Sequence, residues 1–115
     1  MPLPENIVLF RKYVRRDLRF AAEVLGEGAA FADIPGGREQ DPERAARMRE
    51  TVAAFLFVDH QHGARLAKAK TVAEIEEILT ILQAWEDTAT SRGFRLGLFQ
   101  ARDRIQQSLN RKPEV

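Results

Sequence analysis

The sequence predicts an all-α protein: a four-helix bundle-like single domain, with a long irregular loop between the first two helices. Apolar residues recur every three to four positions along nearly the whole chain, which is the spacing of one face of an α-helix. Glycine and proline fall mainly between these periodic segments, where they mark helix ends and turns. A length of 115 residues, of which 44% are apolar, is sufficient for one domain with its own core.

The first helix is predicted to run over about residues 4–25. Proline suits a first helical position, here Pro4, and Gly26 is expected to end the helix. The residues expected to face the core are Ile7, Phe10, Val14, Leu18, Ala21 and Leu25. A second set widens this apolar stripe along one edge: Leu9, Tyr13, Phe20 and Val24.

Residues 26–41, with the sequence GEGAAFADIPGGREQD, are predicted to form the long loop. Four glycines and a proline are poorly tolerated inside a helix. A connection of this length within a compact helical domain is expected to be functional or mobile. Phe31 and Ile34 are candidates for docking the loop onto the domain.

Three further helices are predicted at about residues 42–70, 72–91 and 94–111. Asp41 is expected to cap the first of these with Pro42 at its first position, and Gly63 is a point where it could kink or split. Thr71 and Glu74 have the spacing of a capping box at the start of the next helix. Gly93 is expected to end that helix.

The composition narrows the range of possible functions. The chain has no cysteine, which removes thiolate catalysis and cysteine-based zinc sites, and its formal net charge is only +1. The longest apolar run, residues 52–58, is too short to cross a bilayer, and the first residues do not resemble a signal peptide. No phosphate-binding glycine loop or nucleophile–base pair is visible. These observations favour a cytoplasmic protein that is not an enzyme and needs no cofactor.

The stretch FVDHQHG, residues 57–63, places polar residues on an otherwise apolar helical face. Asp59 and His62 are three positions apart and can meet on one face of a helix. A metal-binding or catalytic bundle centred on these two residues is one interpretation, but the matching ligands on other helices are missing. We therefore expect a structural contact in which the carboxylate holds the imidazole ring, with neither residue acting as a metal ligand.

A basic face is predicted on the first helix, opposite its apolar stripe. It consists of Arg11, Lys12, Arg15, Arg16 and Arg19. Like charges at this spacing repel one another, so a counter-charge is expected. The acidic residues of the third helix (Glu74, Glu76, Glu77, Glu86 and Asp87) are one source, within the chain or between subunits, and an acidic partner is another.

An alternative function is that of a DNA-binding regulator, which would use the last helix and the basic face of the first helix. The last helix carries side chains of the types that contact phosphates and base edges, namely Arg95, Gln100, Arg102 and Arg104. The short connection before it would suit a helix-turn-helix. The balanced total charge and the lack of interleaved aromatic residues argue against this alternative.

The favoured interpretation is a regulatory or interaction protein, acting as a homodimer or in a complex with another protein. The sequence AAFLFV, which contains Phe55, Leu56 and Phe57, is apolar on every side of its helix. A single bundle buries only one stripe of each helix, so some of these apolar residues would stay exposed. Their exposure predicts a partner that binds at these three residues or at the basic face. The competing explanation is that Phe31 and Ile34 of the loop cover the surplus.

Overall fold

The computed structural model describes residues 2–37 and 40–112 and confirms the all-α prediction. Its helices are α1 (Glu5–Ala32), α2 (Pro42–Leu66), α3 (Val72–Thr88) and α4 (Arg92–Leu109). Residues 1 and 113–115 of the predicted domain, and residues 38–39 of the predicted loop, lie outside the described residues. None of the described helices combines the length and the hydropathy that crossing a membrane requires.

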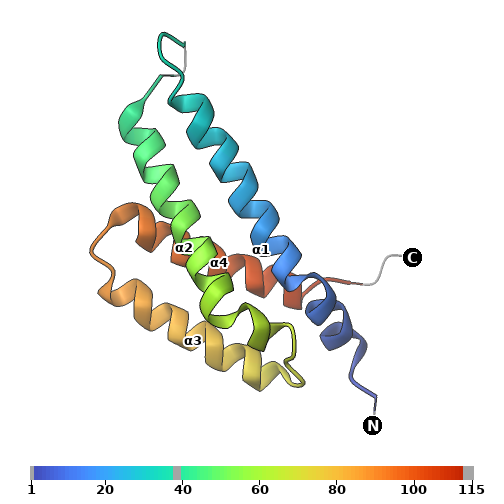
Figure 1. Cartoon of the computed structure of the whole chain (residues 1–115). Coiled ribbons are helices and arrows are strands. Elements are labelled where there is room, and N and C mark those ends of the chain that lie inside the picture. Colours follow the sequence, from blue (N-terminus) through green and yellow to red (C-terminus); the bar gives the residue numbers. More distant parts are fainter. Residues whose placement is uncertain (1, 38–39, 113–115) are drawn as a thin grey trace.

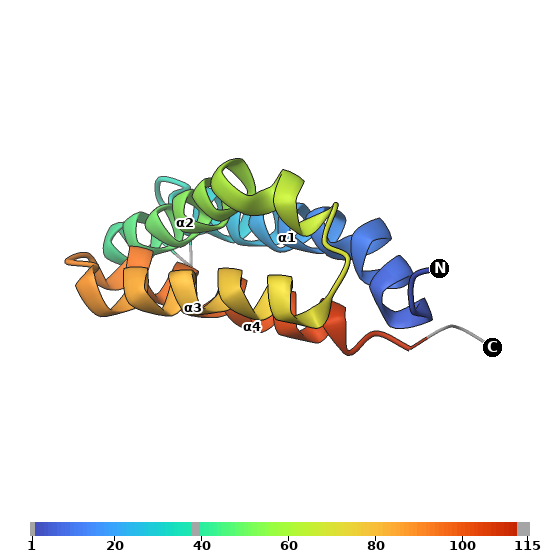
Figure 2. The same ribbon diagram turned by 90° about the horizontal axis from the view of Figure 1, so that it is seen from below.

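The helices form two layers, each made of two helices that follow one another in the chain (Figures 1 and 2). One layer contains α1 and α2, and the other contains the shorter pair α3 and α4. α4 packs against all three other helices, whereas α2 and α3 have few contacts. The molecule is flat as a result, with extents of 59 × 36 × 18 Å.

The core lies between the two layers, where α4 crosses α1 and α2. Its large side chains are almost completely buried: Ile7, Phe10, Val14 and Leu18 of α1, Phe55, Val58 and Leu66 of α2, Ile75, Ile78 and Leu82 of α3, and Leu98 and Ile105 of α4. These residues occupy the three- and four-residue spacing expected of core-facing helices.

Two glycines allow α4 to approach α2 closely. A Cβ atom on Gly97 would lie 2.5 Å from the Cβ of Ala54 and 2.7 Å from the carbonyl oxygen of Thr51. The hydroxyl of Thr51 donates a buried hydrogen bond of 3.0 Å to the carbonyl of Gly93. The backbones therefore meet without an intervening side chain, which fixes where the two layers cross.

The boundary between α3 and α4 was predicted wrongly. Gly93 does not end α3, which stops at Thr88, but lies in the first turn of α4. Ser91 caps α4 by accepting a hydrogen bond from the N–H of Phe94 at 3.2 Å. A serine at this position satisfies a free N–H group of the first turn. Because α4 already begins after Ser91, Gly93 lies inside the helix, where it contacts α2.

The predicted loop over residues 26–41 is also wrong, because α1 continues through Gly26 and Gly28 to Ala32. Ala29 and Ala32 of this extension are buried, as is Ala45 on α2. A Cβ atom on Gly28 would lie 2.5 Å from the terminal methyl of Met48, so the glycine permits close packing of α1 against α2. Continued hydrogen bonding and packing outweigh a helical cost of about 1 kcal/mol per glycine.

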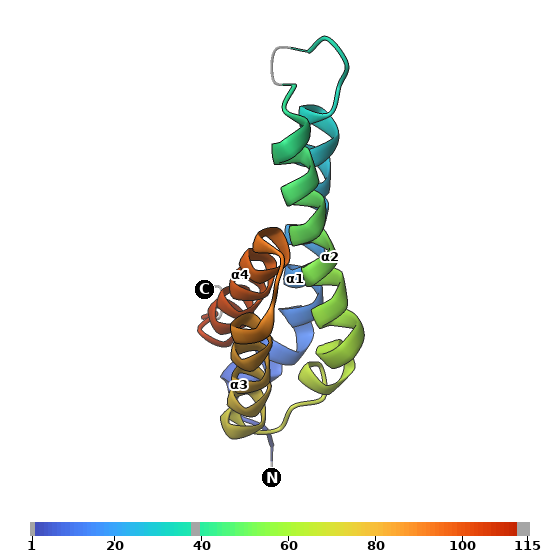
Figure 3. The same cartoon turned by 90° about the vertical axis from the view of Figure 1, so that its left-hand side faces the viewer.

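The last turns of α1 and the first turns of α2 project together beyond α3 and α4 (Figures 1 and 3). We call residues 26–46, without the undescribed residues 38 and 39, the arm. Phe31 and Ile34 lie near its tip and are 59% and 47% exposed. The explanation that these two residues cover the apolar part of α2 is therefore wrong.

The start of α2 follows the prediction, whereas its end does not. Asp41 accepts a hydrogen bond from the N–H of Arg44 at 3.0 Å, and α2 passes Gly63 without a break. The helix ends at Leu66 instead of Lys70. The capping box predicted that the carboxylate of Glu74 would accept a hydrogen bond from the N–H of Thr71. It accepts instead from the N–H of the preceding residue, Lys70, at 2.8 Å. This bond ties the connection between α2 and α3 to α3.

Candidate functional site

Asp59 pairs with α1 and not with His62, so the predicted acid–histidine contact is wrong. Its two carboxylate oxygens accept hydrogen bonds from Arg15 at 2.9 and 3.3 Å, and Arg19 donates a third at 3.4 Å. Burial alone would raise the pKa of Asp59, but the hydrogen bond and charge of Arg15, together with the charge of Arg19, lower it below its usual value. A carboxylate held by two arginines is a strong structural contact between α1 and α2.

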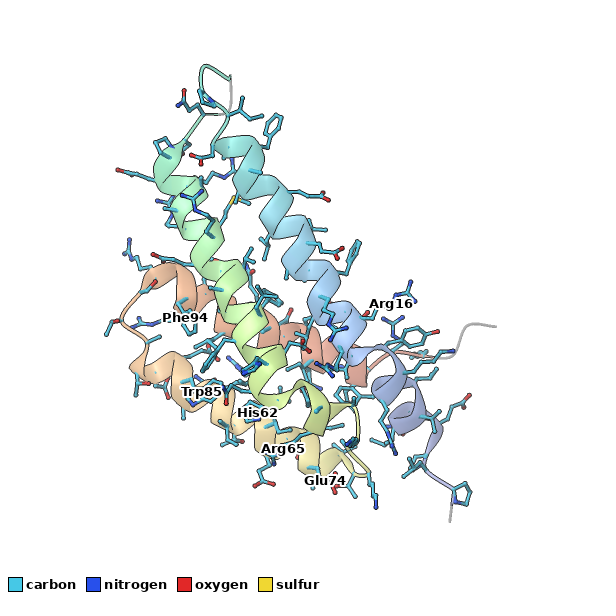
Figure 4. All side chains as sticks on the ribbon, in the orientation of Figure 1. Arg16, His62, Arg65, Glu74, Trp85 and Phe94 are labelled. Carbon is cyan, nitrogen blue, oxygen red and sulfur yellow. The ribbon has the colours of Figure 1, made fainter. Side chains whose placement is uncertain are left out.

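His62 is buried and has no polar partner. It is 8% exposed, and neither ring nitrogen makes a hydrogen bond. The imidazole packs against Trp85 of α3, with 5.1 Å between the ring centroids (Figure 4). Burial, followed by the charge of Arg65, lowers the pKa of His62. The histidine is therefore expected to be neutral and to act as a packing residue.

The described residues contain no group of three or more histidine, aspartate or glutamate side chains arranged to hold a metal ion. Asp59 is engaged by Arg15 and Arg19, and His62 faces Trp85. The two residues on which a metal or catalytic site would depend thus have different partners.

A largely apolar surface hollow lies between α2, α3 and α4, on Trp85, the residue against which His62 packs. The ring of Phe57 is 5.0 Å from that of Trp85 and 5.9 Å from that of Phe94. These rings border a hollow of about 410 Å³ that is also lined by the apolar Ala89 and Leu98 and, along the connection to α4, by the polar Thr88, Thr90 and Ser91. Trp85 and Phe94 flank it in Figure 4. We call this hollow the aromatic groove.

The exposed face of α2 next to the aromatic groove carries no charge. Its exposed residues between Thr51 and Arg65 are Ala53, Leu56, Phe57, His60, Gln61 and Ala64. Leu56 is 53% exposed and Phe57 39% exposed, whereas Phe55 is only 2% exposed. Of the three predicted partner-binding aromatic and aliphatic residues, Phe55 is therefore a core residue, and Leu56 and Phe57 are available at the surface.

Most of the basic face of α1 is used within the molecule. Arg11 donates to the carbonyl of Ala67 at 3.2 Å, and Arg15 and Arg19 bind Asp59. Among the described residues no ion pair joins α1 to α3, so α3 does not supply the counter-charge within the molecule, and Asp59 of α2 supplies it instead. Lys12 and Arg16 remain exposed, with their cationic groups 5.3 and 5.8 Å from the centre of the Tyr13 ring.

Two of the four residues proposed for nucleic-acid binding make internal contacts. Arg102 donates two hydrogen bonds to the buried carboxylate of Glu86, at 2.6 and 3.2 Å, and Arg95 donates to the carbonyl of Ala89. Gln100 is half-buried and Arg104 is exposed. Because α4 packs against α1, α2 and α3, it does not project as an isolated recognition helix would.

The aromatic groove was only partly predictable from the sequence. Trp85 and Phe94 lie on the apolar edges of α3 and α4, a position that suits the core as well as a surface groove. Their proximity to Phe57 depends on the crossing of three helices, which periodicity within one helix does not determine.

The fold and this groove define the chain as a small helical bundle with an apolar surface hollow. The sequence matches no family model, and neither the curated proteins nor the solved structures include a significant match to it.

Proposed function

We propose that the protein is a non-enzymatic interaction protein of the cytoplasm, which binds an apolar segment of another protein across the aromatic groove and the uncharged face of α2. The observation that carries the proposal is the continuity of these two surfaces, because Phe57 belongs to both. An apolar hollow bordered by aromatic rings is a frequent anchor point for a side chain of a bound protein.

The chemistry of this surface determines what it would bind. Between Thr51 and Arg65 the only charged side chain of α2 is Asp59, which is engaged by Arg15. A highly charged ligand would thus be desolvated without compensation, whereas an aromatic or large aliphatic side chain could fill the hollow. Fully burying an exposed side chain such as Leu56 contributes about 1.5–3 kcal/mol. The expected occupant is therefore an apolar helix or extended segment with one or two large anchor residues.

Peptide display provides a defined test, since the natural partner need not be known. Peptides are selected from a random library on the immobilised protein, and their binding is followed by tryptophan fluorescence. Trp85 is the only tryptophan of the chain and lines the groove, so its emission reports occupancy directly. We expect selected peptides to contain aromatic or large aliphatic residues and to change this emission.

A matched pair of variants locates the binding. Leu56→Asp places a charge on the proposed surface, and Leu96→Asp places one at a similarly exposed leucine of α4 that does not line the groove. We expect Leu56→Asp to weaken peptide binding at least about tenfold, equivalent to 1.4 kcal/mol, with Leu96→Asp unchanged. Equal binding by both variants, or peptides that leave the Trp85 emission unaltered, would contradict the proposal.

A further inference from the structure

α4 begins at the point where the arm leaves the two-layer part of the molecule (Figure 3). A hollow of about 200 Å³ lies beside its first turn and is lined by one apolar side chain from each of three helices, namely Leu25 of α1, Met48 of α2 and Leu96 of α4. Leu96 is 48% exposed. Sites for drug-sized ligands measure about 300–1,000 Å³, so this hollow has room for one large side chain of a bound peptide rather than for a small molecule.

Three arginines line the same hollow: Arg44 and Arg47 of α2 and Arg92 of α4. All three are exposed, and among the described residues none of them takes part in an ion pair. Glu50 contacts the same turn of α4, but its carboxylate accepts a hydrogen bond from the N–H of Gly93 at 3.2 Å and does not line the hollow. The described residues of the hollow therefore include three cations and no acidic side chain.

This placement of the arginines is unfavourable for the helices themselves. Arg92 is the first residue of α4, whose first turn contains no acidic residue. The helix dipole disfavours a cation at this end, by an amount on the order of 0.3–1 kcal/mol. Arg44 and Arg47 are three residues apart on α2 and repel each other. Charges that cost stability and satisfy no group within the molecule indicate a ligand that supplies the missing negative charge.

The hollow adjoins a second one, which extends it along the side of α4 that faces α1. The second hollow has a volume of about 400 Å³ and shares Leu25 and Gln100 with the first. Phe20 and Val24 of α1 line it and are 62% and 51% exposed. Both were predicted to widen the core stripe of α1, but the structure places them at the surface. We call the two hollows together the arginine groove.

We propose that the arginine groove binds an acidic segment of a partner protein, with a large apolar side chain beside Leu96 and carboxylates at the arginines. The charged residues that line the groove are four arginines and one aspartate: Arg44, Arg47, Arg92, Arg104 and Asp103. Arginine forms strong, often bidentate hydrogen bonds with carboxylates. The hollow between the three unpaired arginines is lined by aliphatic side chains and lacks the aromatic rings on which bases stack, which favours an acidic peptide over a nucleic acid. No residue of this groove lines the aromatic groove, so either proposal can fail without the other.

Peptide selection on the Leu56→Asp variant tests the arginine groove separately, because this substitution is expected to weaken binding at the aromatic groove. We expect the selected peptides to combine aspartate and glutamate with a large apolar residue, to bind the wild type equally well, and to leave the emission of Trp85 unchanged. Their binding is measured by the fluorescence anisotropy of a fluorescein label. It should weaken as sodium chloride is added, because salt screens exposed charges.

A matched pair of double variants locates the binding. Arg44→Glu with Arg47→Glu should weaken it at least about tenfold, equivalent to 1.4 kcal/mol. Arg65→Glu with Lys68→Glu makes the same change in net charge near the other end of α2 and should leave binding unchanged. Peptides in which lysine replaces every acidic residue should bind the first double variant but not the wild type, a gain that loss of folding would not produce.

Three results would overturn the proposal. The first is a selection that enriches no acidic peptides, and the second is equal binding of the peptides by the two double variants. The third is tighter binding of a single-stranded DNA than of the peptides, lost in the first double variant, which would assign the groove to nucleic acid. Circular dichroism of each variant checks that it is folded.

Discussion

The carboxylate of Asp59 lies directly over the backbone of Gly63, one turn further along α2. Because Gly63 has no side chain, the guanidinium of Arg15 can pass over it and reach this carboxylate. A Cβ atom on Gly63 would lie 2.4 Å from an oxygen of Asp59 and 2.8 Å from Nε of Arg15. The glycine inside α2, which in sequence indicated a possible kink, instead makes room for the main ion pair between α1 and α2.

Gly63→Ala is therefore expected to destabilise the protein although alanine is the better helix former. Displacing the Arg15–Asp59 pair should lower the free energy of unfolding by about 1–2 kcal/mol, more than the gain of about 1 kcal/mol in helix propensity. Gly26→Ala is the matched control, because nothing lies within 4 Å of its Cβ position in α1. Urea unfolding should show a gain of about 0.5–1 kcal/mol for Gly26→Ala, and a gain of that size for Gly63→Ala would contradict the assigned role.

Gly97→Ala should be more damaging than Gly28→Ala. The added methyl at position 97 would meet the backbone of Thr51, which cannot move without shifting α2 against α4. At position 28 it would meet only the flexible end of Met48. We expect thermal and urea unfolding to show a loss of about 1–3 kcal/mol for Gly97→Ala and little change for Gly28→Ala. Equal losses would mean that the α2–α4 crossing is not fixed by this contact.

The buried histidine makes the stability depend on pH. The pKa of His62 is lower in the folded protein than its value of 6.5 in an unfolded chain, so below about pH 6.5 the unfolded state binds more protons. The stability associated with neutral His62 is fully present above that pH and is lost as the pH falls towards the lowered pKa of the folded state. We expect His62→Leu to remove this part of the pH dependence in urea unfolding measured from pH 8 to 5. His60→Leu, at an exposed position of the same helix, should retain it.

Arg102 and Arg104 should differ strongly although they are neighbours in α4. Arg102→Ala leaves the carboxylate of Glu86, which is only 9% exposed, without its partner. The expected loss is about 1–3 kcal/mol, whereas substitution of the exposed Arg104 should change stability by no more than about 0.5 kcal/mol. Calorimetric unfolding of the two single variants provides the comparison. Similar losses for both would show that the Glu86 contact contributes little.

The fold class was predictable because core-facing residues repeat at helical spacing in all four helices. The end of α1 was not predictable, since glycine has an intrinsic helical cost, while the benefit of Gly28, its close approach to Met48, comes from another helix. The limits of α3 and α4 were misplaced for the same reason. Glycine is typical of a helix end, but Gly93 lies inside α4 and its carbonyl accepts a hydrogen bond from Thr51 of α2.

The candidate site was predictable only in part. Leu56 and Phe57 were expected at a binding surface because their segment is apolar on every side, and both are exposed. Asp59 was assigned to His62 because sequence spacing reveals neighbours on one helix. Its stronger partner, Arg15, is far away in sequence and is brought near by the packing of α1 against α2. Such long-range pairing is not contained in the periodicity of either helix.

The arm is held together mainly by alanines, and this makes it the part of the helical layer that opens most easily. Ala29, Ala32 and Ala45 bury far less apolar surface than the phenylalanines and leucines where α4 crosses. Local opening there costs less than global unfolding, so backbone amides of the arm should exchange with deuterated water earlier than those of the core.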